Sequence, residues 1–164
     1  MVASLRHDLD YVVFAMPRSM SRWLSVALSF NGHTCYHDIE HDIELPYEKG
    51  NGIAGSCETG TALANNGIVL LREPADSLNS MAAAYGIKGK ELSDFVYRRY
   101  DELSSSGLPT YRYSELKNSR VVAEIQDMLL GESMSLRRID NLLTAKITVS
   151  GQYLHKRLKD AAIH

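Results

Sequence analysis

The sequence predicts an α/β fold with three layers, α-β-α, in which helices cover both faces of a central parallel sheet. Short apolar runs alternate along the chain with longer segments that carry apolar residues at helical spacing. One run, Gly67–Leu71, is apolar at every position after its glycine, as expected for a strand covered on both faces. A chain of 164 residues, 45% of them hydrophobic, can bury one core. We therefore expect one domain over residues 1–164, with a core at about 10–131 and a helical tail at 132–164.

The predicted strands end at turn residues. The first, Val12–Phe14, is β-branched or aromatic throughout, and Pro17 has no N–H with which to continue a ladder. The other strands are expected at residues 33–36, 53–54, 67–71 and 109–113.

The predicted helices begin at polar capping residues. Ser19 or Ser21 is expected to cap the first helix, and Asp76 or Ser77 to cap a helix that ends at Gly86. Further amphipathic segments lie at residues 92–103, 119–130 and 136–143, and a basic helix is expected around residues 156–159.

Composition excludes several classes of function. No apolar run is long enough to span a bilayer, and the first eight residues do not resemble a signal peptide, so we expect a cytoplasmic protein with no membrane partner. Cys35 and Cys57 lack the spacing of a disulfide framework and are expected to be buried thiols. With a formal net charge of −2, nothing indicates a nucleic-acid surface. A small anionic ligand needs only a local basic site.

Such a site is expected where the first strand meets the first helix. Arg18 and Arg22 stand beside Ser19 and Ser21, next to the free backbone N–H groups of a helix start. Together these donors would hold a phosphate or sulfate. Two further polar residues, His37 and Arg72, also follow predicted strands. Because parallel sheets bind ligands at the carboxyl ends of their strands, we expect Arg18, His37 and Arg72 to converge.

Two segments together resemble the sulfotransferase family. Pro17-Arg18-Ser19-Met20-Ser21-Arg22-Trp23 is similar to the loop that binds the 5′-phosphosulfate, and Arg72 with Ser80 has the spacing of the 3′-phosphate motif. A weaker match is Tyr111-Arg112-Tyr113-Ser114-Glu115-Leu116, similar to the family's Arg-Tyr-Glu-Asp-Leu segment. The standard P-loop of nucleoside triphosphatases is absent, since no glycine precedes Arg18.

The resemblance implies a nucleotide-binding fold of the P-loop type, with 3′-phosphoadenosine 5′-phosphosulfate (PAPS) as donor and 3′-phosphoadenosine 5′-phosphate (PAP) as product. It further implies transfer of a sulfuryl group to a hydroxyl or amine acceptor, without a metal. Arg18 would contact the leaving phosphate oxygen, Trp23 the adenine, and Arg72 with Ser80 the 3′-phosphate. The implied nucleotide-binding residues are Arg18, Ser19, Met20, Ser21, Arg22, Trp23, Arg72 and Ser80.

This chain departs from the family at two places. Met20 stands where the family usually has glycine, which would strain a loop that needs a positive φ there. The C-terminal Arg-Lys-Gly segment has no counterpart, and its possible substitutes are Arg137, Arg138, Lys156 and Arg157.

Several assignments stay open at this level. His37 is the expected general base because histidine titrates near neutral pH, with Asp38 and His41 as alternatives. Trp23 fits an ordinary core position as well as a position against the adenine ring of the nucleotide. Arg72 fits an ion pair with Glu73 or Asp76 as well as a phosphate contact.

Three other functions compete with sulfuryl transfer. A helix at residues 33–44 would place three histidines on one face as a metal site, with four acidic residues as further ligands: His33, His37, His41, Asp38, Glu40, Asp42 and Glu44. A kinase-like phosphotransferase would also use the anion loop. A third alternative is a nucleotide-binding protein that has kept the pocket for the donor but no longer catalyses group transfer.

Overall fold

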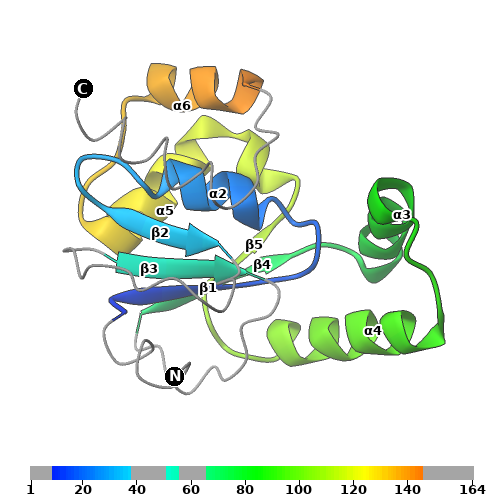
Figure 1. The fold of residues 1–164 in the computed structure, drawn as a ribbon. Coiled ribbons are helices and arrows are strands. Elements are labelled where there is room, and N and C mark those ends of the chain that lie inside the picture. Colours follow the sequence, from blue (N-terminus) through cyan, green and yellow to red (C-terminus); the bar gives the residue numbers. More distant parts are fainter. Residues whose placement is uncertain (1–8, 38–50, 56–65, 146–164) are drawn as a thin grey trace.

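The computed structural model describes residues 9–37, 51–55 and 66–145 of the chain. Its centre is a five-stranded sheet in the order β2-β3-β1-β4-β5, with every neighbouring pair parallel (Figure 1). The strands are β1 (Tyr11–Ala15), β2 (Thr34–His37), β3 (Asn51–Gly55), β4 (Gly67–Leu71) and β5 (Thr110–Arg112). The predicted α/β fold with a parallel sheet is thus confirmed.

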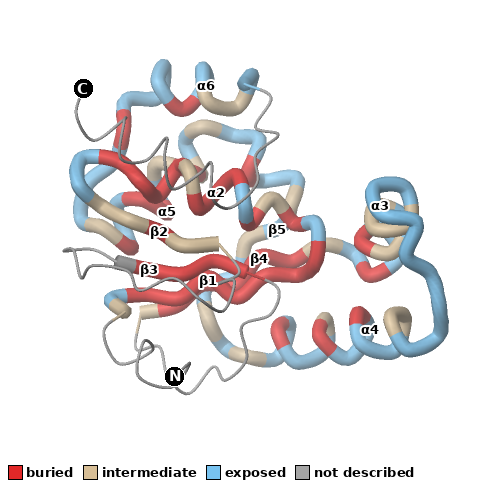
Figure 2. Tube along the Cα trace, in the orientation of Figure 1, coloured by how far each residue is buried: buried red, intermediate tan, exposed pale blue. Residues whose placement is uncertain are grey.

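Helices flank the sheet on both faces. They are α2 (Ser21–Ala27), α3 (Pro74–Tyr85), α4 (Lys90–Ser104), η3 (Glu115–Lys117), α5 (Ser119–Leu130) and α6 (Leu136–Thr144). Alternate residues of β1 point to opposite faces, so Val13 packs in one core cluster with α2, α5 and α6, and Phe14 in a second cluster with α3 and α4. Figure 2 shows β1, β3 and β4 buried between these helices. The continuous apolar runs of the inner strands follow from this double covering.

The strand order sends the helical connections that follow β1 and β4 towards opposite edges of the sheet. The chain leaves β1 through α2 towards β2 on one side of the sheet, and leaves β4 through α3 and α4 towards β5 on the other. Because the two connections diverge, a crevice opens at the carboxyl ends of β1 and β4.

Both predicted helix caps are wrong. Met20, not a serine, is the N-cap of α2, since the Ser19 hydroxyl donates to the carbonyl of Met16 at 2.7 Å and Ser21 is already helical. Helix α3 begins at Pro74, earlier than expected, because proline suits the first helical turn. The Ser77 hydroxyl instead donates to the Pro17 carbonyl at 2.9 Å, which ties α3 to the loop after β1.

The prediction of buried thiols is confirmed for Cys35, which is fully buried. Burial raises the pKa of its thiol to about 12. Cys57 lies outside the described residues. Within the described part of the chain, no helix is long and apolar enough to cross a membrane. Helix α6 confirms the first part of the helical tail predicted at residues 132–164. The basic helix expected around residues 156–159 lies outside the described residues.

Candidate functional site

A cavity of about 390 Å³ opens at the carboxyl ends of β1 and β4. Three arginines and three aromatic residues contribute to its wall, and the wall contains no aspartate or glutamate among the residues that the structure describes. The lining residues are Pro17, Arg18, Met20, Ser21, Arg22, Trp23, His37, Arg72, Ser80, Met81, Tyr85 and Tyr113. Positive charge without a carboxylate among the described lining residues favours an anion over a cation in this cavity.

The loop between β1 and α2 has an unusual backbone. Arg18 and Met20 have positive φ values of 63° and 69°, while Pro17 and Ser19 do not, so the sign of φ alternates along the loop. Successive N–H groups in such an alternation form a concave nest for an anion. Within the described residues, the backbone N–H groups of Met20, Ser21 and Arg22 donate no hydrogen bond. The loop therefore offers unused donors beside Arg18.

The positive φ at Met20 gives a direct prediction. Met20→Gly and Met20→Ala both remove a side chain that packs partly on the core, but only glycine also removes the left-handed strain. We expect the glycine variant to be more stable than the alanine variant by about 1 kcal/mol. Urea unfolding of the two variants measures the difference. Equal midpoints would show that this backbone position carries no strain.

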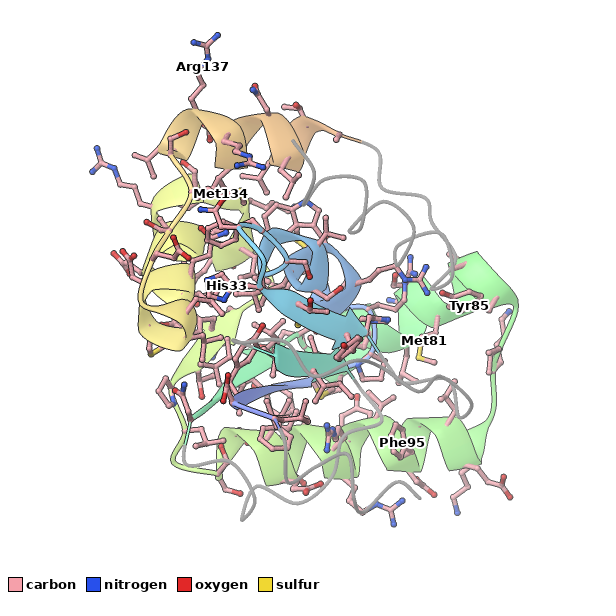
Figure 3. The ribbon with its side chains drawn as sticks, turned by 60° about the vertical axis from the view of Figure 1, so that its left-hand side comes forward. His33, Met81, Tyr85, Phe95, Met134 and Arg137 are labelled. Atoms are coloured by element: carbon pink, nitrogen blue, oxygen red, sulfur yellow. The ribbon has the colours of Figure 1, made fainter. Side chains whose placement is uncertain are left out.

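Arg18 bridges the loop and helix α3. Its Nε donates to Ser80 Oγ at 3.1 Å, its Nη1 donates to the Tyr85 hydroxyl at 3.2 Å, and its guanidinium carbon lies 5.4 Å from the centre of the Tyr85 ring. Tyr85 and Met81, labelled in Figure 3, both extend from α3, and both line the cavity. The loop arginine and the predicted 3′-phosphate serine thus face the same space.

Arg72 follows β4 and is stacked on an aromatic ring. Its guanidinium carbon lies 4.2 Å from the centre of the Tyr113 ring, and its Nη1 donates to the carbonyl of Arg18. The alternative that Arg72 pairs with Glu73 is wrong, because Glu73 instead binds Arg112 at 2.8 Å. Asp76 makes no ion pair with Arg72 either. The Nε of Arg72 is buried and has no hydrogen-bond partner in the described structure, while the residue as a whole lines the cavity.

His37 and Trp23 complete the wall near α2. His37 ends β2, and its Nε2 lies 3.0 Å from the hydroxyl of Ser21, a contact that holds the imidazole at the cavity. Trp23 is only 9% exposed and belongs to the core cluster, yet it also lines the cavity, so its two interpretations are compatible. Its indole N–H donates to the carbonyl of Leu142 at 3.1 Å, which couples α6 to this wall.

The structure thus brings together every predicted site residue except Ser19. The side chain of Ser19 is fully buried and its hydroxyl is used by the Met16 carbonyl, so it does not line the cavity. Sequence reasoning missed Tyr85, whose contact with Arg18 spans 67 residues and leaves no local pattern. It named Tyr113 only as part of a weak motif, without a role.

The metal-site alternative is not supported. Residues 34–37 form a strand rather than a helix, and the two described histidines have separate partners. His33 lies 2.6 Å from a carboxylate oxygen of Glu132, near α5 (Figure 3), whereas His37 contacts Ser21. The described residues contain no group of three ligands that could hold a metal, and His41 with its neighbouring acids lies outside them.

The proposed substitutes for the missing C-terminal segment do not reach the cavity where they are described. Figure 3 shows Arg137 pointing away from the molecule on α6, and Arg138 is exposed and lines no part of the cavity wall. Lys156 and Arg157 lie outside the described residues, as do Asp38 and His41, the alternative bases.

Comparison of the chain with models of protein families, with curated proteins and with solved structures gave no match in any of the three.

Proposed function

We propose that this chain binds PAPS and transfers its sulfuryl group to a hydroxyl or amine acceptor, in a fold of the P-loop nucleotide-binding type. The proposal is carried by one observation: Arg18, Arg22 and Arg72 line a single cavity that has aromatic walls and no described acidic residue. Its volume of about 390 Å³ is in the range of small-molecule sites, about 300–1,000 Å³.

The residues of the cavity fit the nucleotide in two parts. The nest of the β1–α2 loop, with Arg22, suits the 5′-phosphate, because phosphates favour backbone N–H groups and guanidinium ions. Arg72 suits the 3′-phosphate, since it lines the cavity and makes no ion pair within the described residues. Ser80 lines the same cavity and adds a hydroxyl. Trp23 also lines the cavity and would supply an aromatic surface for the adenine.

The roles of the protein in transfer follow from these positions. When bound, PAPS supplies an activated sulfuryl group. Arg18 is an exposed residue of the β1–α2 loop, and its guanidinium donates hydrogen bonds to Ser80 and Tyr85. These contacts position the guanidinium to neutralise charge on the leaving phosphate oxygen. His37, held by Ser21, would accept the proton of the acceptor hydroxyl or amine at its imidazole.

Isothermal titration calorimetry with three nucleotides tests the binding proposal. PAP should bind at least about tenfold more tightly than adenosine 5′-monophosphate (AMP), since a phosphate bound by an arginine is worth about 1.5–3 kcal/mol. PAP should also bind more tightly than ATP. Preference for ATP would instead favour a phosphotransferase, and binding of none of the three would remove the nucleotide proposal.

A pair of arginine variants connects that result to the cavity. Arg72→Ala should reduce the preference for PAP over AMP to about twofold or less, since it removes the cation assigned to the 3′-phosphate. Arg120→Ala provides the control, because this exposed arginine lies on α5 and does not line the cavity. An unchanged preference in Arg72→Ala would remove the role given to Arg72.

A further inference from the structure

We infer that Tyr113 positions Arg72 through its ring, and that this contact sets the selectivity of the cavity for a ligand with a second phosphate. This inference rests on the proposed nucleotide function. It assigns Tyr113 a role in the site that the sequence alone did not indicate.

Strand register places Tyr113 beside Arg72. Leu71, the last residue of β4, is paired with Arg112 of β5, and the N–H of Tyr113 donates to the Leu71 carbonyl at 2.8 Å. The residues that follow the two strands are therefore neighbours at the same sheet edge. The Tyr113 ring and the Arg72 guanidinium approach to 4.2 Å, within the range of a favourable cation–π contact. A ring held by a strand end restricts the orientations open to the planar guanidinium.

Lys117 brings a second positive charge to the same ring. Lys117 is the last residue of η3, which begins two residues after Tyr113, and its Nζ lies 4.9 Å from the ring centre. Arg72 and Lys117 thus share one aromatic residue, and neither makes an ion pair within the described residues. Lys117 is not among the described residues that line the cavity, so Arg72 is the cation of this pair that is assigned to the ligand.

Neighbouring carboxylates that could neutralise these cations are turned elsewhere. Glu73, next to Arg72 in sequence, binds the Arg112 guanidinium at 2.8 Å. Glu115, two residues before Lys117, accepts the backbone N–H of Arg112 at 2.6 Å. Arg112 therefore occupies both acids, and the positive charge of Arg72 remains available to a ligand. Arg72 and Tyr113 both line the cavity.

The test compares PAP with AMP, because the two differ only in the 3′-phosphate. Tyr113→Leu should weaken PAP binding by about tenfold while changing AMP binding by less than about twofold. Tyr113→Phe keeps the ring and should retain the wild-type preference for PAP. Tyr97→Leu, an exposed tyrosine on α4 away from the cavity, is the matched control and should bind both nucleotides as the wild type does.

The outcomes separate this inference from the function on which it rests. If the wild type does not prefer PAP to AMP, the proposed function fails. If the wild type prefers PAP and Tyr113→Leu retains that preference, the positioning role fails while the function stands. An equal loss for both nucleotides would mean that the ring contacts a part they share, and would also overturn the role.

Arg72→Lys provides a second route should Tyr113→Leu not fold. Lysine keeps the charge but cannot stack as a planar group, so the preference for PAP should fall by about tenfold. Full retention of the preference in Arg72→Lys would show that a stacked guanidinium is not required, and would overturn the inference.

Discussion

Gly52→Ala is expected to destabilise the protein by about 3 kcal/mol, because an added Cβ would overlap the ring of Tyr11. Gly52 lies in β3 and pairs with Tyr11 of β1 and Cys35 of β2, so its backbone cannot move without disturbing three strands. The Tyr11 ring cannot yield either, since the residue is 1% exposed within the core cluster. Closely packed interiors relax little around an extra methyl group.

Urea unfolding of Gly52→Ala and of the double variant Gly52→Ala/Tyr11→Leu measures this effect. Leucine lacks the outer ring atoms that the new Cβ would meet, so the double variant should recover part of the loss, beyond the sum of the two single changes. Tyr11→Leu alone gives the cost of losing the ring. A wild-type unfolding midpoint for Gly52→Ala would show that β3 does not pass this closely over Tyr11.

This contact also shows where sequence reasoning stops. The apolar run of β1 predicts a buried strand from local pattern alone, and a glycine before Ile53 is compatible with any strand end. That Gly52 must lack a side chain follows only from the order β3-β1, which is a pairing of residues about forty positions apart. Strand alternation with helices predicts a parallel sheet, but hydrophobic pattern does not encode which strands are neighbours.

The residues of the candidate site also include some that the sequence could predict and some that it could not. Arg18, His37 and Arg72 could be predicted to converge because each follows a parallel strand, and topology alone brings such positions to one edge. The Ser19 hydroxyl could not be assigned, since a serine in a turn can donate to the main chain or to a ligand with the same spacing. Tyr85 was missed because nothing local marks a helix residue that meets a distant arginine.

The sequence left the backbone at Met20 as a condition: methionine is strained there if the loop needs a positive φ. The structure has a φ of 69° at Met20, so the condition applies. The surrounding contacts supply the constraint: Ser19 binds the Met16 carbonyl, and Ser77 binds the Pro17 carbonyl from α3. The loop is therefore fixed from both sides before any ligand binds, which reduces the cost of ordering its N–H groups around a phosphate.

Under the proposed function, His37→Ala should lower sulfuryl transfer by about 10²- to 10⁴-fold while leaving PAP affinity within about twofold of the wild type. The reason is the separation of roles in the cavity. The cations assigned to the phosphates come from the β1–α2 loop and the end of β4, whereas His37 comes from the end of β2, where its ring contacts the Ser21 hydroxyl. Removal of the imidazole thus removes a proton acceptor and no phosphate ligand.

Transfer of labelled sulfate from PAPS to a panel of alcohols, phenols and amines measures the first quantity, and calorimetry with PAP the second. His33→Ala is the matched control, because His33 binds Glu132 outside the cavity wall and should retain transfer. Wild-type turnover in His37→Ala would remove this residue from the role of base. A wild-type chain that binds PAP but transfers to no acceptor would instead favour a nucleotide-binding protein without transfer. The two measurements must be made together, since only a loss of turnover with retained affinity separates a base from a binding residue.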